Sequence, residues 1–183
     1  AEAIGQLGGI AKKIRSKAGF KQKDSLYFAA LKKDKEWLRK EFEARKNAGF
    51  EVKWMEAEAI QKKYKLDKAF GGILSKQGAS VDAFMLVHEI LEYNCKRGLQ
   101  VYDKTGLADV RYGTRLNEVN VSTGATIKAK KIVYCIGYES TTMIREKFVD
   151  LISTFAIVSE VEPGLSRQYK DVLIWNTSDP YVY

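Results

Sequence analysis

The 183-residue chain has little of the chemistry on which most hydrolases and metalloproteins depend. It contains one histidine, His88, and two cysteines, Cys95 and Cys135, which lie far apart in the sequence. Cysteine and histidine do not cluster at metal-ligand spacing, and no nucleophile-elbow pattern is present. A metal centre and a Ser-His-Asp or Cys-His arrangement are therefore not expected. A single histidine within a helical pattern is more often a half-buried structural residue, which is our interpretation of His88.

Long apolar runs are also lacking. No run approaches the roughly 20 residues that a membrane span needs, and the first residues do not resemble a signal peptide. Two isolated cysteines within apolar patterns predict reduced, packed thiols, as in a cytoplasmic protein. The net charge of +8 comes mainly from lysine pairs scattered among acidic residues. Because no arginine-rich or aromatic-interleaved stripe occurs, a solvated surface is favoured over a nucleic-acid site.

A glycine-rich nucleotide-binding turn is absent as well. The glycines at positions 5, 8 and 9 do not fit G-x-G-x-x-G, and no predicted strand precedes them. Gly71-Gly72 does not fit the pattern either, and no Walker-type loop occurs. We interpret these glycines as helix-packing and turn residues.

Hydrophobic periodicity predicts a mixture of helices and strands. Asp34 and Asp82 are the expected N-caps of two long helices, and Gly49 and Gly98 are their expected stops. Helices are predicted at residues 4–18, 34–48, 56–64, 82–97 and 141–149. Strands are predicted at residues 25–31, 50–55, 69–75, 99–102, 107–112, 119–122, 126–129, 131–136, 154–160, 171–175 and 181–183.

The most informative segment extends from Gly98 to Ser140. It contains a strand, a short connection, two strands joined by a polar turn at residues 122–125, and an apolar strand that ends at Gly137. This order is typical of the second half of a dinucleotide-binding domain. An apolar strand suits the centre of a parallel sheet, where ligands bind beyond the carboxyl end. A buried strand followed by an ordinary glycine turn fits the segment equally well.

Further passages follow in a recognisable order. Residues 25–29 (SLYFA) form an aromatic strand, residues 78–82 (GASVD) precede a long helix, and residues 124–137 read GATIKAKKIVYCIG. From about residue 24 to residue 183, this order resembles the flavin-dependent oxidoreductases of the D-amino acid oxidase and glycine oxidase family. Two family features have no counterpart in the chain: the N-terminal G-x-G-x-x-G unit and a C-terminal segment with a substrate-binding arginine.

The resemblance implies an α/β (α+β) fold with two parts. Residues 1–97 and 150–183 would form a substrate-binding domain, a mostly antiparallel sheet with flanking helices. Residues 98–149 would be the partial remainder of an FAD-binding domain. FAD is the implied cofactor, and the chain is expected to be an inactive middle fragment of a longer enzyme. That parent enzyme would oxidise an amino acid or related small amine by hydride transfer to FAD. A missing βαβ unit would leave a strand edge exposed, which favours a homodimer.

The resemblance also implies cofactor-binding residues. Leu107 matches the position whose backbone meets adenine, so its side chain would matter only for packing. Ile136, Gly137 and Tyr138 match a loop near the ribityl-phosphate side of the cofactor. Because the flavin performs the redox step, no catalytic acid or base is expected in this chain.

Three aromatic residues are candidates for the substrate face. Tyr27, Trp175 and Tyr181 lie on predicted strands of the substrate domain, where their side chains could cover the flavin. Ordinary core packing is the alternative for each of them. Trp37 and Trp54 are assigned to the core.

Two other functions stay open at this point. A related flavoenzyme could act on a 2-hydroxy acid, sarcosine or a glycerol phosphate. A non-catalytic α+β binding module could use the basic charge to meet an acidic partner, and its binding would then weaken with salt.

Overall fold

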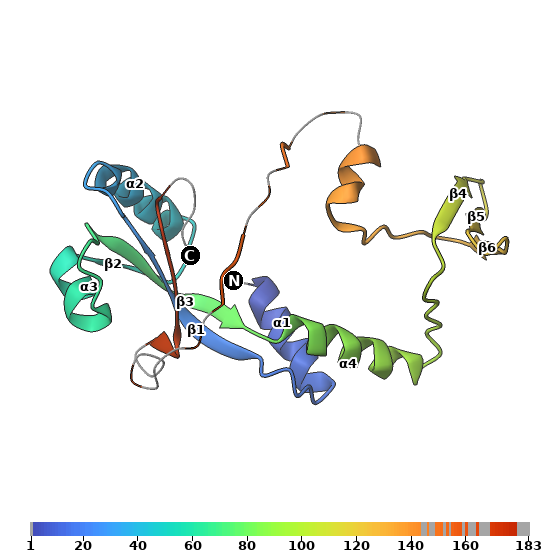
Figure 1. Cartoon of the computed structure of the whole chain (residues 1–183), viewed down its shortest axis with the longest axis horizontal. Coiled ribbons are helices and arrows are strands. Elements are labelled where there is room, and N and C mark those ends of the chain that lie inside the picture. Colours follow the sequence, from blue (N-terminus) through green and yellow to red (C-terminus); the bar gives the residue numbers. More distant parts are fainter. Residues whose placement is uncertain are drawn as a thin grey trace. The chain divides into compact units, whose positions relative to one another are not determined.

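The computed structural model describes residues 2–143, 146, 149–151, 153, 155–158, 160, 164 and 169–178. The chain divides into two compact units, shown in Figure 1. The first unit comprises Ala1–Leu99 and Glu160–Tyr183, and the second comprises Gln100–Ser159.

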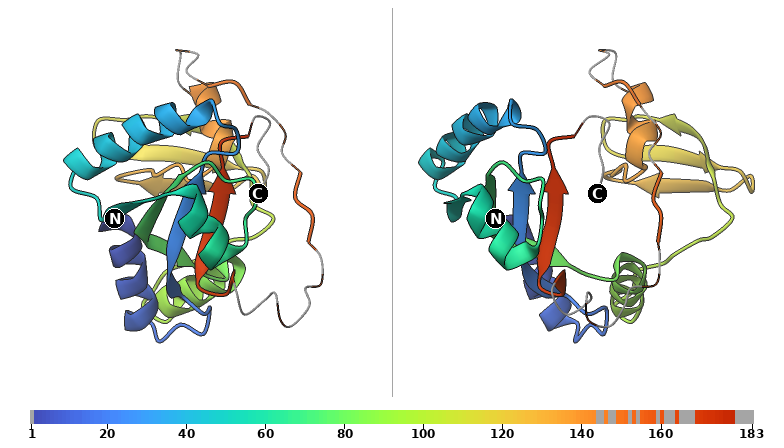
Figure 2. Two further views of the ribbon diagram at one scale, coloured as in Figure 1. Left: turned by 90° about the vertical axis from the view of Figure 1, so that its left-hand side faces the viewer. Right: turned by 60° about the vertical axis from the view of Figure 1, so that its left-hand side comes forward.

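A four-stranded sheet forms the centre of the first unit. Its strands, in the order β2-β3-β1-β7, are Val52–Met55 (β2), Gly72–Ser80 (β3), Lys21–Phe28 (β1) and Val172–Asn176 (β7). β3 pairs antiparallel with both β1 and β2. β1 and β7 are parallel, and Figure 2 shows the two arrows side by side. The predicted mixed fold with a mostly antiparallel sheet is confirmed.

Two helices cover the opposite faces of this sheet, because neighbouring residues of a strand point to opposite sides. On one face, Leu38 and Phe42 pack against Ile73 of β3; they belong to α2 (Asp34–Asn47). On the other face, Ile60 packs against Leu26 of β1; it belongs to α3 (Ala57–Tyr64). The first unit therefore has an apolar core on each side of one sheet.

Two further helices of this unit share a third cluster. Ala11 and Leu86 are buried in it, with Phe20 and Ile90 packed alongside. These helices are α1 (Glu2–Lys13) and α4 (Ala83–Cys95).

The ends of the helices can be compared with the predicted caps and stops. The Asp82 carboxylate accepts a hydrogen bond from the Met85 backbone N–H at 2.9 Å, so this cap is confirmed. Gly49 and Gly98 follow their helices with positive φ of 80° and 96°, as expected of helix stops. The prediction for Asp34 is wrong: it is the first residue of α2, which begins without a side-chain cap. Its carboxylate makes a tertiary hydrogen bond instead.

The second unit contains a three-stranded antiparallel sheet in the order β4-β5-β6. Its elements are β4 (Leu107–Arg111), β5 (Asn117–Val121), β6 (Thr126–Ala129) and the 3₁₀ helix η1 (Gly137–Met143). The hairpin predicted around residues 122–125 is confirmed, since it joins β5 to β6. The helix predicted at 141–149 starts earlier, at Gly137, and part of that range lies outside the described residues.

Three predicted strands differ from the structure. Residues 99–102, 131–136 and 155–158 form no strand, and Val133 is 82% exposed. A central parallel strand needs a neighbouring strand on each side to complete its hydrogen bonds. Among the residues that the structure describes, none pairs as a strand with 131–136. The strand predicted at 181–183 lies outside the described residues.

Several side chains also differ from their predicted environments. Cys95 and Cys135 are free thiols, but both are exposed, so the prediction of packed thiols is wrong. At 100° per helical residue, Cys95 and His88 project away from the buried Leu86 of the same helix. His88 is accordingly exposed, and its ring lies 4.3 Å from that of Phe84.

The two tryptophans assigned to the core differ from each other. Trp54 packs against the cluster beneath α2, which confirms its assignment. Trp37 is 54% exposed, so its assignment to the core is wrong. It directly precedes Leu38, and only Leu38 and Phe42 of α2 lie on the buried stripe. Within the described part of the chain, no helix is long and apolar enough to cross a bilayer.

Candidate functional site

A row of side chains crosses the first unit's sheet on the face that α2 covers. Trp54, Ile73, Tyr27 and Trp175 occupy directly paired positions on β2, β3, β1 and β7. Paired positions present their side chains on the same face. The rings of Tyr27 and Trp175 are 6.0 Å apart between centroids, with an angle of 31° between their planes. The structure therefore brings together two of the three predicted substrate residues, and both are half-buried.

Helix α2 adds two residues to this row. The Trp37 ring meets Tyr27 edge-on, with centroids 6.3 Å apart and planes at 90°. The Arg45 guanidinium lies 5.7 Å from the centroid of the Tyr27 ring and is paired with Glu41, Nε to Oε1 at 2.8 Å. We call Tyr27, Trp37 and Trp175 the aromatic cluster. Its three rings come from two strands and a helix, and Trp37 presents part of its surface to solvent.

The Thr177 hydroxyl connects the segments that follow β1 and β7 to the start of α2. The Ala30 N–H donates to Thr177 Oγ1 at 3.1 Å, and Thr177 Oγ1 donates to Asp34 Oδ2 at 2.5 Å. The Thr177 N–H also donates to the carbonyl of Phe28 at 3.1 Å, which continues the parallel pairing beyond β7. Sequence reasoning missed Thr177, although a threonine directly after an apolar strand was a visible signal.

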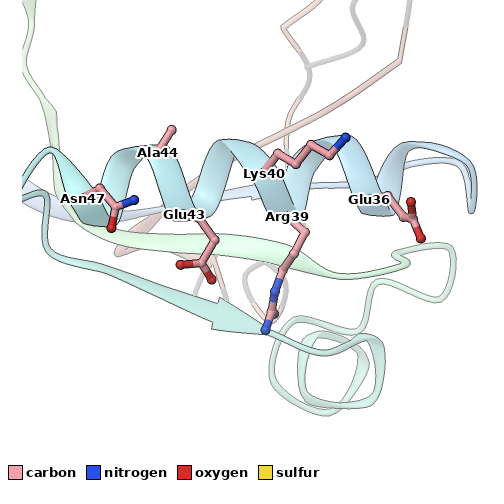
Figure 3. A pocket seen from close by; sticks show the side chains of 6 residues that line it. All are labelled: Glu36, Arg39, Lys40, Glu43, Ala44 and Asn47. Carbon is pink, nitrogen blue, oxygen red and sulfur yellow. The ribbon is translucent and has the colours of Figure 1, made fainter.

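The outer side of α2 carries a shallow hollow of about 560 Å³. Figure 3 shows its lining side chains, which are those of Glu36, Arg39, Lys40, Glu43, Ala44 and Asn47. Charges of both signs line it, and the Arg39 guanidinium lies over the Trp54 ring, 4.6 Å from its centroid. Glu56 lies nearby: a hydrogen bond from Lys35 and another from Trp54 lower the pKa of its carboxyl. We interpret this hollow as a charged helix surface, since no described residue predicted for the site lines it.

The predicted cofactor residues all belong to the second unit. Leu107 begins β4 opposite Val121, and its side chain is exposed. Ile136 and Tyr138 are exposed as well. Gly137 lies between them with φ of +63°, a conformation that favours glycine, and it begins η1.

These residues suit a group such as FAD. The exposed side chains of Ile136 and Tyr138 offer contact area to a ligand, and the glycine turn leaves the backbone open to close approach. Ser140 Oγ donates to the Gly137 carbonyl at 2.7 Å, which secures the start of η1. Tyr181, the third predicted substrate residue, lies outside the described residues.

The sequence matches the family described as FAD dependent oxidoreductase over residues 1–183. The chain belongs to this family. The resemblance to the D-amino acid oxidase family is thereby confirmed, and so is FAD as the cofactor of the family. No curated protein matches the chain.

Solved structures show the same fold at low sequence identity. A glycine oxidase from Geobacillus kaustophilus is 16% identical, with a TM-score of 0.69 over 76% of this chain and 39% of that one. An L-amino acid deaminase from Proteus vulgaris is 18% identical, with a TM-score of 0.57 over 70% of this chain and 31% of that one. An L-proline dehydrogenase from P. horikoshii is 15% identical, with a TM-score of 0.55 over 69% of this chain and 35% of that one. The chain thus spans between about a third and two-fifths of the length of these proteins.

Proposed function

We propose that this chain is the middle part of a longer flavoenzyme that oxidises an amino acid or a related small amine. The observation that carries this proposal is the family match over residues 1–183. The fold likeness to a glycine oxidase, an amino acid deaminase and a proline dehydrogenase supports an amine substrate. Because the chain spans only 39% of the glycine oxidase, we expect it to be inactive by itself.

The two units support separate roles in binding the substrate and the cofactor. In this proposal, residues 1–97 and 150–183 form the substrate-binding domain, and residues 98–149 form part of the FAD-binding domain. The support is that the structure separates Gln100–Ser159 from the rest of the chain; this unit begins two residues after the proposed start and ends ten residues after the proposed end. The backbone at Leu107, the exposed side chains of Ile136 and Tyr138, and the turn at Gly137 would contact FAD.

The aromatic cluster would contact the substrate. Tyr27 and Trp175 form a half-buried pair at one end of the sheet, and aromatic rings supply apolar contact area at low entropic cost. Tyr181 would join them as the third substrate-binding residue. When bound, FAD supplies the hydride acceptor for oxidation of the carbon beside the amine. The chain's own side chains then need only to bind and orient the substrate and exclude water, which is consistent with its single histidine.

The test uses the longer polypeptide that contains this chain. Its visible absorption is recorded before and after anaerobic addition of glycine, D- and L-amino acids, and proline. The expected result is a flavin spectrum that bleaches with one class of amine. Sarcosine, 2-hydroxy acids and glycerol phosphate are the matched controls. A flavin that bleaches only with one of these three controls, or a colourless protein that takes up no flavin, would contradict the proposal.

Two expectations, on the cellular location and on the oligomeric state, remain predictions. Free thiols at Cys95 and Cys135 support a reducing, cytoplasmic location. A homodimer paired through an exposed sheet edge would place an edge strand at the interface. The edge strands are β2 and β7 in the first sheet and β4 and β6 in the second. Light scattering after gel filtration would decide the second point, since a monodisperse monomer contradicts it.

A further inference from the structure

We infer that Thr177 is a positioning residue: its hydroxyl holds the rings of the aromatic cluster in the arrangement in which they would contact the substrate. The inference rests on the proposed function, because only that proposal gives the aromatic cluster a substrate to contact. It concerns a residue outside the cluster, so it can be tested without removing any ring.

The first step of the argument is the bonding at one hydroxyl. Thr177 Oγ1 accepts a hydrogen bond from the Ala30 N–H and donates its own proton to Asp34 Oδ2. A hydroxyl that donates to a carboxylate at 2.5 Å makes a charge-assisted bond, roughly twice as strong as a neutral one. Both bonds are partly shielded from water. One oxygen thus ties the chain after β1, the chain after β7 and the first residue of α2.

The second step is that the Asp34 carboxylate is available to accept this hydrogen bond from Thr177. An acidic residue at a helix start usually accepts from backbone N–H groups of the first turn. Here α2 begins without any side-chain cap, and the Asp34 carboxylate accepts from Thr177 instead. The start of α2 is therefore held in part by a tertiary contact, which removal of the Thr177 hydroxyl would break.

The third step connects the tie to the rings. Trp37 lies three residues after Asp34, on the neighbouring turn of the same helix face. Trp175 lies on β7 two residues before Thr177, which directly follows the end of this strand. Both rings meet at Tyr27, with centroid distances of 6.3 Å and 6.0 Å. The hydroxyl thus controls the approach of a helix-borne ring and a strand-borne ring to one tyrosine.

The first experiment uses the 183-residue chain itself. In a Trp54→Phe background, the only tryptophans left are those of the aromatic cluster. Thr177→Val keeps the side-chain shape but removes the hydroxyl, and we expect the near-ultraviolet circular dichroism of the coupled rings to weaken. Thr177→Ser should restore the signal, and Asp34→Ala should reproduce the loss. The control Thr126→Val removes a hydroxyl bonded to Asn120 in the second unit and should leave the signal unchanged.

Far-ultraviolet spectra show whether each variant is folded. If Thr177→Val does not fold, Thr177→Ser and Asp34→Ala still decide the matter. A near-ultraviolet signal that is unchanged in folded Thr177→Val, or in folded Asp34→Ala, overturns the inference regardless of how the flavin behaves.

The second experiment measures substrate handling in the longer polypeptide. Misplacement of a contact surface by about 1 Å can cost about 100-fold in rate, and we expect a loss of about tenfold in kcat/KM for Thr177→Val. The loss should appear mainly in KM, and Thr177→Ser should recover it. An unchanged KM beside a weakened ring signal overturns the link to substrate. A flavin that no amine bleaches contradicts the proposed function, while the ring signal still decides whether Thr177 orders the cluster.

Discussion

Replacing Leu26 with alanine should lower the free energy of unfolding of the first unit by about 3 kcal/mol. Leu26 is 0% exposed and lies in the core between the sheet and α3, beside Met55 and Ile60. The substitution removes about three carbon groups at roughly 0.8 kcal/mol each, or about 2.4 kcal/mol. A residual cavity adds to this loss, because close-packed neighbours relax only in part. Met55 can move into some of the space, which keeps the expected total near the lower end for buried leucines.

Urea unfolding followed by far-ultraviolet circular dichroism and tryptophan fluorescence measures this loss. With a slope of about 2 kcal/mol per molar urea, the midpoint should fall by about 1.5 M. The matched control is Leu31→Ala, since Leu31 is 50% exposed and should change stability by less than about 1 kcal/mol. Leu38→Ala, on the opposite face of the sheet, should cause a loss similar to that of Leu26→Ala.

Two results would refute this reasoning. Equal midpoints for Leu26→Ala and Leu31→Ala would show that the α3 side of the sheet is not packed as described. If either Leu26→Ala or Leu38→Ala unfolded in two separate transitions, the cores on the two faces of the sheet would not unfold as one unit.

Two further predictions concern a glycine and a carboxylate. Gly71→Ala should destabilise the first unit by about 2 kcal/mol and shift the fluorescence of Trp54, because φ is +131° and the new Cβ would lie 2.6 Å from Trp54 Cζ2. Gly9→Ala is the control, since there is open space around its Cβ. Equal urea midpoints for the two variants would contradict the prediction. Ser16→Ala should raise the pKa of Glu89 toward its ordinary value of 4.5, since hydrogen bonds from the Ser16 hydroxyl and the Lys17 N–H lower it. The folded-state pKa is depressed, so this stabilisation is present above pH 4.5 and is lost as the pH falls through the folded-state pKa. Carboxyl titration by NMR measures the shift, and an unmoved titration curve would exclude the hydroxyl as its cause.

Local patterns predicted the elements that a few neighbouring residues encode. The alternation of Val52, Trp54 and their neighbours predicted β2, and the turn at residues 122–125 predicted the β5-β6 hairpin. Asp82 was identified as a cap because its partner, the Met85 N–H, is three residues away. The hairpin and the cap have their stabilising contacts within a few residues, whereas β2 pairs with β3, which follows only after α3.

Features that depend on distant contacts were predicted poorly. Residues 131–136 have the apolar character of a central strand, but a strand also needs neighbours, which composition does not report. Asp34 has the chemistry of a cap, and the same carboxylate serves equally well as the acceptor for Thr177. For the candidate site, the sequence indicated Tyr27 and Trp175 as aromatic strand residues. Their contact depends on the parallel pairing of β1 with β7, which no local pattern encodes.

The parallel pairing of β1 with β7 has a consequence for biosynthesis. Asp24 lies beside Val172, so the strand that completes the first sheet leaves the ribosome only after the whole second unit. At about 5–20 residues per second, the nascent chain carries an incomplete sheet for several seconds or longer. During that interval the edge of β1 has backbone groups without their strand partner, and such edges readily pair with other chains. The order of synthesis therefore leaves this edge unpaired longest in the nascent chain, and the solubility of the newly made protein should depend on how quickly β7 pairs with β1.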